Sequence, residues 1–210
     1  MNVNQMITEL TQRLEDSSGS EFTSTIKIDA LNNAQDRLVA LLNSKYLTEL
    51  ETLEKYTNST NEPKMVLGLF NLATLSNPVL NGSEGILAVK IHNEKYMNRL
   101  SMSDVKQFDS GMVESDLSDP YYVVFADRIE LVPPTTLVAI PLDVYYMKKP
   151  TLLIVGGECD LNAGLHYLVV GLAEAYCWTN SEKYIRSREA EKIVIDQVSI
   201  MNMKLESKGV

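Results

Sequence analysis

The chain has 210 residues, 45% of them hydrophobic, and its 28 acidic against 19 basic side chains give a formal net charge of −9. This length suffices for one large domain, or one domain with an insertion, to bury a core without disulfide or metal staples. The acidic balance argues against ordinary nucleic-acid binding, because neutralising phosphates takes clustered Lys and Arg. The densest basic group is interleaved with glutamates at spacings that indicate a solvated helix face, and it comprises Lys183, Arg186, Arg188 and Lys192.

Cysteine usage and hydropathy indicate the compartment in which the chain is kept. Cys159 and Cys177 are its two cysteines, and neither belongs to a CxxC pair, so we expect buried free thiols in a reducing cytoplasm. Residues 1–25 have no basic segment followed by an apolar core, and we therefore expect no signal peptide. No apolar run approaches the ~20 residues that a membrane span requires.

Two helices are predicted near the N-terminus. Residues 4–16 repeat apolar side chains at helical spacing, and the Ser-Ser-Gly-Ser run at 17–20 ends this helix. Residues 26–44 carry a second apolar stripe, and Asn32 and Gln35 lie largely off it.

Short β segments are predicted after this helical part. Residues 45–62 permit more helix until a polar run ends them, and an apolar run then covers residues 65–72. Residues 85–92 predict a well-buried strand, and residues 96–100 a further short one. Ser101, with an aspartate three residues later, indicates the start of a helix.

The segment 119–150 predicts a β meander. Pro133 and Pro134 cannot donate to a hydrogen-bond ladder, so the strand before them ends there or lies at a sheet edge. The expected strands are 121–125, 129–132, 137–140 and 142–147, with a hairpin turn at 126–128.

Two helices are predicted after the meander. Asp160 is the expected N-cap of a helix that runs to about Trp178 and is apolar almost all round, which indicates burial on several sides. The Thr-Asn-Ser-Glu run at 179–182 predicts a capping box for a last amphipathic helix, 181–205, whose final turns we expect to project beyond the domain. Gly156 and Gly157 are expected to form a flexible joint before these helices.

Together these elements predict an α+β fold. Helices from the N- and C-terminal parts form a bundle, an antiparallel β-rich domain is inserted between them, and a long helix ends the chain. We expect the bundle to comprise residues 1–62 and 156–210, and the inserted β-rich domain residues 63–155.

The sequence offers no set of residues suited to catalysis or cofactor binding. Gly156 and Gly157 lack the Lys-Ser/Thr of a phosphate loop. His166 lies within the apolar helix and predicts a hydrogen-bonded core histidine, because metal and catalytic sites need several partners. We therefore predict a protein that is not an enzyme and takes no metal or cofactor. A rival hypothesis places a metal-dependent hydrolase or ligand-binding site in the acidic segment 109–127, although its carboxylates have no EF-hand spacing.

Two tyrosine doublets are candidates for an interface. Tyr121 with Tyr122, and Tyr145 with Tyr146, lie on predicted strands, in which neighbouring side chains point to opposite faces. Each doublet therefore offers one tyrosine to the core and one to the other face, although all four would also fit within the sheet. Because tyrosine is enriched at interfaces, we predict that the outer ones contact a neighbouring subunit or a tail protein.

The order of these segments resembles that of the head-to-tail adaptor proteins of tailed bacteriophages, the ring-forming neck proteins of the tail tubular protein A type. The resemblance covers most of the chain and rests on a diffuse pattern. The segments that carry it are IDALNNAQDRL (28–38), PYYVVFADRIELVPP (120–134), YYMKKPTLL (145–153) and LNAGLHYLVVGLAEAYCW (161–178). The acidic segment 110–118 and residues 45–61 match less clearly.

The resemblance implies a structural protein of the virion neck, assembled in the cytoplasm of the host bacterium. Such adaptors form a ring, usually a dodecamer, beneath the portal, extend the DNA channel and dock tail or nozzle proteins. Double-stranded DNA would pass through the lumen without specific binding, which an acidic wall favours. We expect Met201, Met203 and Leu205 of the C-terminal segment to bind the portal protein. An alternative within the same class is a second neck ring or a tail-completion protein.

Overall fold

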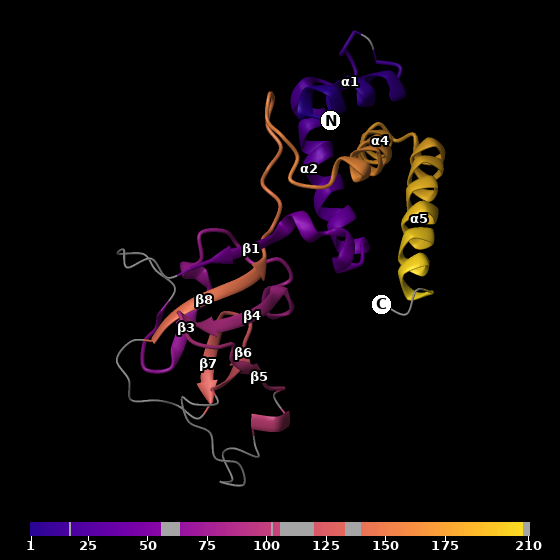
Figure 1. Cartoon of the computed structure of the whole chain (residues 1–210). Coiled ribbons are helices and arrows are strands. Elements are labelled where there is room, and N and C mark those ends of the chain that lie inside the picture. The colour runs from indigo at the N-terminus through magenta and orange to yellow at the C-terminus, as the bar shows by residue number, and fades with distance from the viewer. Residues whose placement is uncertain (17, 56–63, 102, 106–119, 133–139, 208–210) are drawn as a thin grey trace. The chain divides into compact units, whose positions relative to one another are not determined.

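The computed structural model describes residues 1–16, 18–55, 64–101, 103–105, 120–132 and 140–207, and the chain forms two compact units (Figure 1). Met1–Leu50 and Pro150–Val210 form a helical unit, and Glu51–Lys149 forms a β unit. The predicted α+β fold, with helices from both parts of the chain around a β-rich insertion, is confirmed. The boundaries lie earlier than the predicted 62/63 and 155/156, because residues 51–54 form a strand of the β unit.

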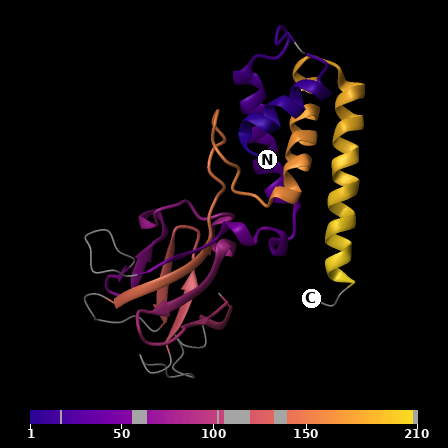
Figure 2. The ribbon, with the colours of Figure 1, turned by 45° about the horizontal axis from the view of Figure 1, so that its top comes forward.

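Four long helices build the helical unit, and three short 3₁₀ turns join them. The helix α4 lies between α2 and α5, and α1 also packs on it (Figures 1 and 2). The helices are α1 Val3–Arg13, α2 Ser24–Leu41, α4 His166–Asn180 and α5 Tyr184–Glu206, and the turns are Ser44–Tyr46, Thr48–Leu50 and Ala163–Leu165.

The helix α4 is the core of this unit. Its sequence is apolar almost all round, and the predicted burial on several sides is confirmed, since ten of its 15 residues are buried. Gly171 lets α5 approach closely, because a Cβ there would lie 2.7 Å from Val194 Cγ2. Small residues at such a crossing allow two helices to pack side by side.

The helix caps differ in part from the predicted ones. Asn2 begins α1 with a capping box, in which its side chain accepts from the Gln5 N–H and the Gln5 side chain accepts from the Asn2 N–H. Asp160 is not the cap of α4, because Asn162 accepts from the Gly164 N–H at 2.8 Å and begins the turn that leads into the helix. The carboxylate of Asp160 instead accepts from the N–H and hydroxyl of Thr151, both at 2.9 Å.

The predicted capping box of α5 is wrong as well. The helix begins at Tyr184 without a side-chain cap. Thr179 lies in the last turn of α4, where its hydroxyl donates to the Ala175 carbonyl and bonds the Ser187 hydroxyl at 2.7 Å. Glu182 takes a left-handed backbone conformation, with φ 60°, in the tight turn between the two helices.

A buried ion pair closes the loop between α1 and α2. The Asp16 carboxylate lies 3.5 Å from Lys27 Nζ, and 5% of each side chain is exposed. It also accepts from the N–H groups of Ser20, Glu21 and Phe22, and Lys27 donates to the Thr11 hydroxyl. Burial alone would raise the pKa of Asp16, but the N–H groups of Phe22 and Glu21 and the charge of Lys27 outweigh it and lower the pKa.

Two sheets of four strands each, within the described residues, build the β unit. In one sheet β8 pairs with β1, β2 and β4, all antiparallel; in the other the order is β3-β7-β6-β5, with β5 and β6 parallel. The strands are β1 Glu51–Glu54, β2 Lys64–Met65, β3 Leu69–Asn71, β4 Ile86–Ile91, β5 Asn98–Arg99, β6 Tyr121–Val124, β7 Arg128–Val132 and β8 Ile140–Met147, with 3₁₀ turns at Leu72–Thr74 and Gly82–Gly85.

The predicted meander is only half correct. The hairpin β6–β7 forms as expected, and the Phe125 N–H donates to the Arg128 carbonyl across its turn. However, β8 belongs to the other sheet rather than following β7. It has buried residues on both faces, and a strand of that kind is suited to the centre of a sheet. The expected strand at 137–140 and the prolines at 133 and 134 lie outside the described residues, except for Ile140.

We predict that Asp16→Asn lowers the stability of the helical unit at neutral pH and that the loss shrinks in acid. Because the folded-state pKa of Asp16 is lowered from 3.8, its ionised form stabilises the fold above that value, and this contribution disappears as the pH falls through the folded value. Urea unfolding at pH values from about 6 to about 3, followed by helical circular dichroism, measures the difference. The exposed Asp36→Asn is the control, and a gap that stays constant with pH would contradict the prediction.

Candidate assembly surfaces

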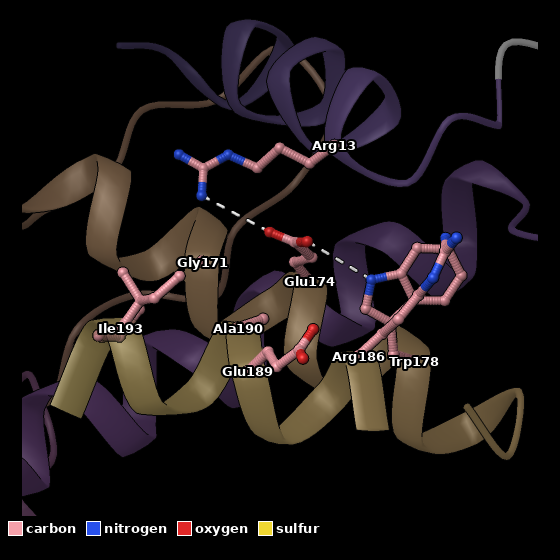
Figure 3. Close-up of a pocket in the computed structure, with 9 residues that line it drawn as sticks. Arg13, Gly171, Glu174, Trp178, Arg186, Glu189, Ala190 and Ile193 are labelled. Carbon is pink, nitrogen blue, oxygen red and sulfur yellow. Dashed lines mark hydrogen bonds and ion pairs between the residues drawn. The ribbon is translucent and has the colours of Figure 1, made fainter. Parts of the chain in front are cut away.

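A groove of about 300 Å³ lies between α4 and α5, beside Arg13 of α1 (Figure 3). At its centre, Glu174 lies 3.6 Å from Nη1 of Arg13 through one carboxylate oxygen and accepts from the Trp178 indole N–H, at 3.4 Å, through the other. The lining residues include no histidine, cysteine or hydroxyl group, so the groove has none of the usual catalytic nucleophiles. Its paired charges and apolar walls are instead suited to packing and recognition.

Trp178 joins several elements of the helical unit. Its ring meets the edge of the Phe22 ring at 5.6 Å, and the cationic groups of Lys183 and Arg186 lie over it at 4.7 and 5.1 Å. The basic group at Lys183, Arg186, Arg188 and Lys192 was predicted to be a solvated helix face. Two of its four residues instead stack on the buried indole of Trp178. Arg188 and Lys192 are exposed, as expected.

The candidate nucleophiles and histidines are placed for structural roles. Burial raises the pKa of the Cys177 thiol to about 12 and also raises that of the half-buried Cys159, which disfavours thiolate chemistry at both. His166 is buried, and its Nε2 lies 2.8 Å from the Leu161 carbonyl, which confirms the predicted hydrogen-bonded core histidine. In the β unit, His92 Nδ1 lies 2.8 Å from Asp143 Oδ1 and links the end of β4 to β8.

The acidic segment of the rival hypothesis falls mostly on residues 106–119, which lie outside the described part of the chain. Within the described part, its member Asp127 pairs with Arg128 at 3.0 Å. Among the residues described, no group of three or more His, Cys, Asp or Glu side chains is placed to hold a metal ion. The described helices include none that is long and apolar enough to cross a membrane.

The two tyrosine doublets alternate as predicted. Tyr122 and Tyr146 are buried in the core of the β unit, and burial raises the pKa of both phenols. Tyr121 and Tyr145 are half-buried. Of the four tyrosines, the latter two therefore expose part of their side chains.

Sequence reasoning missed the neighbour of Tyr145. The exposed Tyr96 donates to the Tyr145 hydroxyl at 3.3 Å, and the two ring centroids lie 5.8 Å apart. Lys90 Nζ lies 5.8 Å from the centre of the Tyr96 ring. No spacing in the sequence predicts this patch, because it depends on the pairing of β4 with β8.

The C-terminal segment is held to the bundle up to Asn202. The amide of Asn202 donates to the Leu41 carbonyl and accepts from the Asn43 N–H, both at 3.0 Å, and Tyr46 donates to the Met201 carbonyl at 2.8 Å. Met201 and the later Leu205 are half-buried, whereas Met203 is exposed. Of the three predicted portal-binding residues, Met203 is therefore the one most open to a partner.

A further surface was not predicted. Residues 152–155, which we call the arm, expose three large apolar side chains while Leu153 is buried. Asn32 of α2 bonds both the N–H and the carbonyl of Leu153, at 2.7 and 3.2 Å, and Gln35 bonds the Thr151 carbonyl at 3.0 Å. These two polar residues, which lie largely off the apolar stripe of their helix, thus fix the arm.

The glycines after the arm form a bonded turn rather than the predicted flexible joint. The Gly157 N–H donates to the Ile154 carbonyl, and its own carbonyl accepts from the Val3 N–H. Gly156, at φ 77°, donates to the Asn4 side chain at 3.1 Å. The arm is therefore tied to both α1 and α2.

Comparison of the chain with protein-family models and with curated proteins finds no match.

We predict that Gly171→Ala destabilises the helical unit by about 1–3 kcal/mol, because the added methyl group would meet Val194 in a packed helix crossing. The double variant Gly171→Ala with Val194→Ala removes the clash and is expected to lose less stability than the sum of the two single changes. Chemical denaturation of the four proteins measures this coupling. Additive losses would contradict the close approach of α4 and α5.

Proposed function

We propose that the protein is a structural subunit of the neck of a tailed bacteriophage, a head-to-tail adaptor that forms a ring beneath the portal. One observation carries the proposal: large apolar side chains remain exposed on rigidly held elements of a helical unit built from both parts of the chain. Exposed apolar groups of this kind mark interaction sites in proteins that are otherwise well packed. The resemblance in segment order to the phage adaptors supplies the class of assembly.

The proposal assigns a partner to each surface. The helical unit contacts neighbouring subunits in the ring, and the C-terminal segment with Met203 binds the portal. The β unit, with Tyr121 and Tyr145 on its outer side, meets the tail or nozzle proteins. A tyrosine stabilises an interface when its ring is buried and its hydroxyl keeps a hydrogen bond. The Tyr145 hydroxyl already has such a bond, with Tyr96.

The acidic character of the chain fits a channel wall. With a net charge of −9, a ring of such subunits has little attraction for DNA phosphates, so a genome can slide through its lumen. The cationic groups of Lys183 and Arg186 stack on the Trp178 ring, and Arg37 forms an ion pair with Glu191. These pairings favour a structural rather than a nucleic-acid-binding role for them.

Co-expression with the portal protein of the same genome tests the proposal. Portal particles purified from the cells and imaged by negative-stain electron microscopy are expected to carry an extra ring at one end. Portal particles without added density at high concentration of this protein would contradict portal binding. Binding to a tail protein in its place would identify a second neck ring or a tail-completion protein.

We predict that Met203→Ser weakens portal binding about tenfold without lowering stability, because the side chain is 57% exposed in the free subunit and buries its apolar surface only in the complex. Pull-down titration on immobilised portal measures the affinity. The control is Leu67→Ser in the β unit, where the side chain is 58% exposed, and it is expected to leave portal binding unchanged. Equal effects of the two variants would remove the C-terminal segment from the portal contact.

A further inference from the structure

The turn that leads into β4 contains the one Asn-Gly pair of the chain, Asn81 and Gly82. Both residues take left-handed backbone conformations, with φ 56° and 57°. Asparagine and glycine adopt such angles most readily, so this turn gives the pair a structural reason. The pair is also the one most prone to a spontaneous reaction of the backbone, because glycine leaves its own nitrogen unhindered for attack on the preceding amide side chain.

We propose that Asn81 is a deamidation site, at which the protein converts to aspartate and isoaspartate forms. The Gly82 backbone nitrogen bonds to Cγ of the Asn81 amide and loses its proton, the bond from Cγ to the amide nitrogen breaks, and ammonia leaves with that proton. The product is a five-membered succinimide. Water opens this ring at either carbonyl, which gives aspartate with the normal main chain, or isoaspartate, whose main chain runs through the side-chain carbonyl.

Both reacting groups of this turn are accessible. The Asn81 side chain is exposed, and within the described part of the chain neither it nor the Gly82 N–H makes a hydrogen bond. Other asparagines are tied instead. Asn43, which a small serine follows, accepts from the Lys45 N–H at 3.0 Å, and Asn162 is bonded through both atoms of its amide.

The turn must open before the reaction takes place. At ψ 25° the Gly82 nitrogen lies roughly opposite the Asn81 Cβ across the Cα–C bond, so the peptide unit between the two residues has to rotate. One hydrogen bond opposes this rotation, from the Glu84 N–H to the Asn81 carbonyl, and its length of 3.3 Å makes it weak. The closed turn therefore slows the reaction without preventing it.

The two products differ in their effect on the fold. Aspartate keeps the main chain and tolerates a left-handed conformation. Isoaspartate lengthens the main chain inside a turn that is already tight, since a Cβ on Gly85 would lie 2.0 Å from the Leu80 carbonyl oxygen. The Leu80 N–H is bonded to Met147 of β8 at 2.8 Å, and the buried Ile86 begins β4 directly after the turn. We therefore expect isoaspartate, but not aspartate, to destabilise the β unit.

Peptide mass spectrometry of the full-length protein, aged at mildly alkaline pH, tests the proposal. Trypsin releases residues 65–90 as one peptide, which carries Asn71, Asn77 and Asn81. A leucine follows Asn71, and a proline without an N–H follows Asn77, so these two are internal references. We expect deamidation at Asn81 to be severalfold faster than at the references, and isoaspartyl methyltransferase to label the aged protein at Asn81.

Two variants separate the chemistry from its effect on stability. Asn81→Gln disfavours the five-membered ring, because its side chain is longer, and is expected to stay unlabelled on ageing. Asn81→Asp is the aspartate product, and we expect it to unfold at the same urea concentration as fresh wild-type protein. The aged wild-type protein, enriched in isoaspartate, is expected to unfold at a lower concentration.

The outcomes decide between the alternatives. An Asn81 that stays as intact as Asn43 in the folded protein, while it reacts in the urea-unfolded chain, would show that the turn protects it and would overturn the proposal. Isoaspartate at Asn81 with an unchanged unfolding midpoint would overturn the expected loss of stability. These measurements need no partner protein, so their failure leaves the neck-ring proposal as it stands.

Discussion

The helical unit depends on the burial of α4 on several sides. Because most residues of this helix are apolar, α1, α2 and α5 each cover part of it, and segments from both parts of the chain are needed to do so. The absence of a side chain at Gly171 makes the crossing with α5 close. The insertion of the β unit at one point of the helical unit is compatible with this requirement, since the cover of α4 comes entirely from the flanking segments.

Because α4 and its neighbours already form the core of the helical unit, the exposed apolar side chains of α5 and the arm are not part of that core. The exposed isoleucines of α5 (Ile185, Ile193 and Ile200) and the arm are both held by well-formed contacts, the isoleucines by the packing of their helix and the arm by the amides of Asn32 and Gln35. Burial of such side chains against a neighbour is worth about 1.5–3 kcal/mol for each large residue that becomes fully covered, before the costs of association are subtracted. A protein that assembles gains this energy, and a solitary one does not.

The sequence predicts the helices and the fold class well, because a helical repeat of apolar residues marks α1 and α2 and a long apolar run marks α4. It predicts the β6–β7 hairpin from its turn and flanking β-formers. It misplaces β8, because pairing with β1 and β4 joins residues 51 to 96 positions apart and no local pattern encodes such a contact. Asp160 is mistaken for a cap because it is a good capping residue near the helix, and only the structure shows that Asn162 has the required geometry.

The candidate surfaces were predictable only in part. Alternation along strands separates the inner from the outer tyrosines, and helical spacing identifies the C-terminal segment. The arm was missed because its four apolar residues resemble a core strand and its supports, Asn32 and Gln35, resemble the polar face of a helix. The amino-acid composition of a helix does not distinguish a side-chain amide that bonds a distant backbone, such as that of Asn32, from one that faces solvent.

The proposed neck-ring function requires that the protein is part of the virion and forms one ring at the portal. If the protein has this function, a phage genome encodes it, and quantitative mass spectrometry of that phage's purified virions, comparing the peptides of this protein with those of the portal protein, tests the proposal directly. We predict that the protein is present and that its copy number equals that of the portal subunit, as a matched ring requires. Its absence from virions, or a copy number on the scale of the capsid protein, would contradict the proposal.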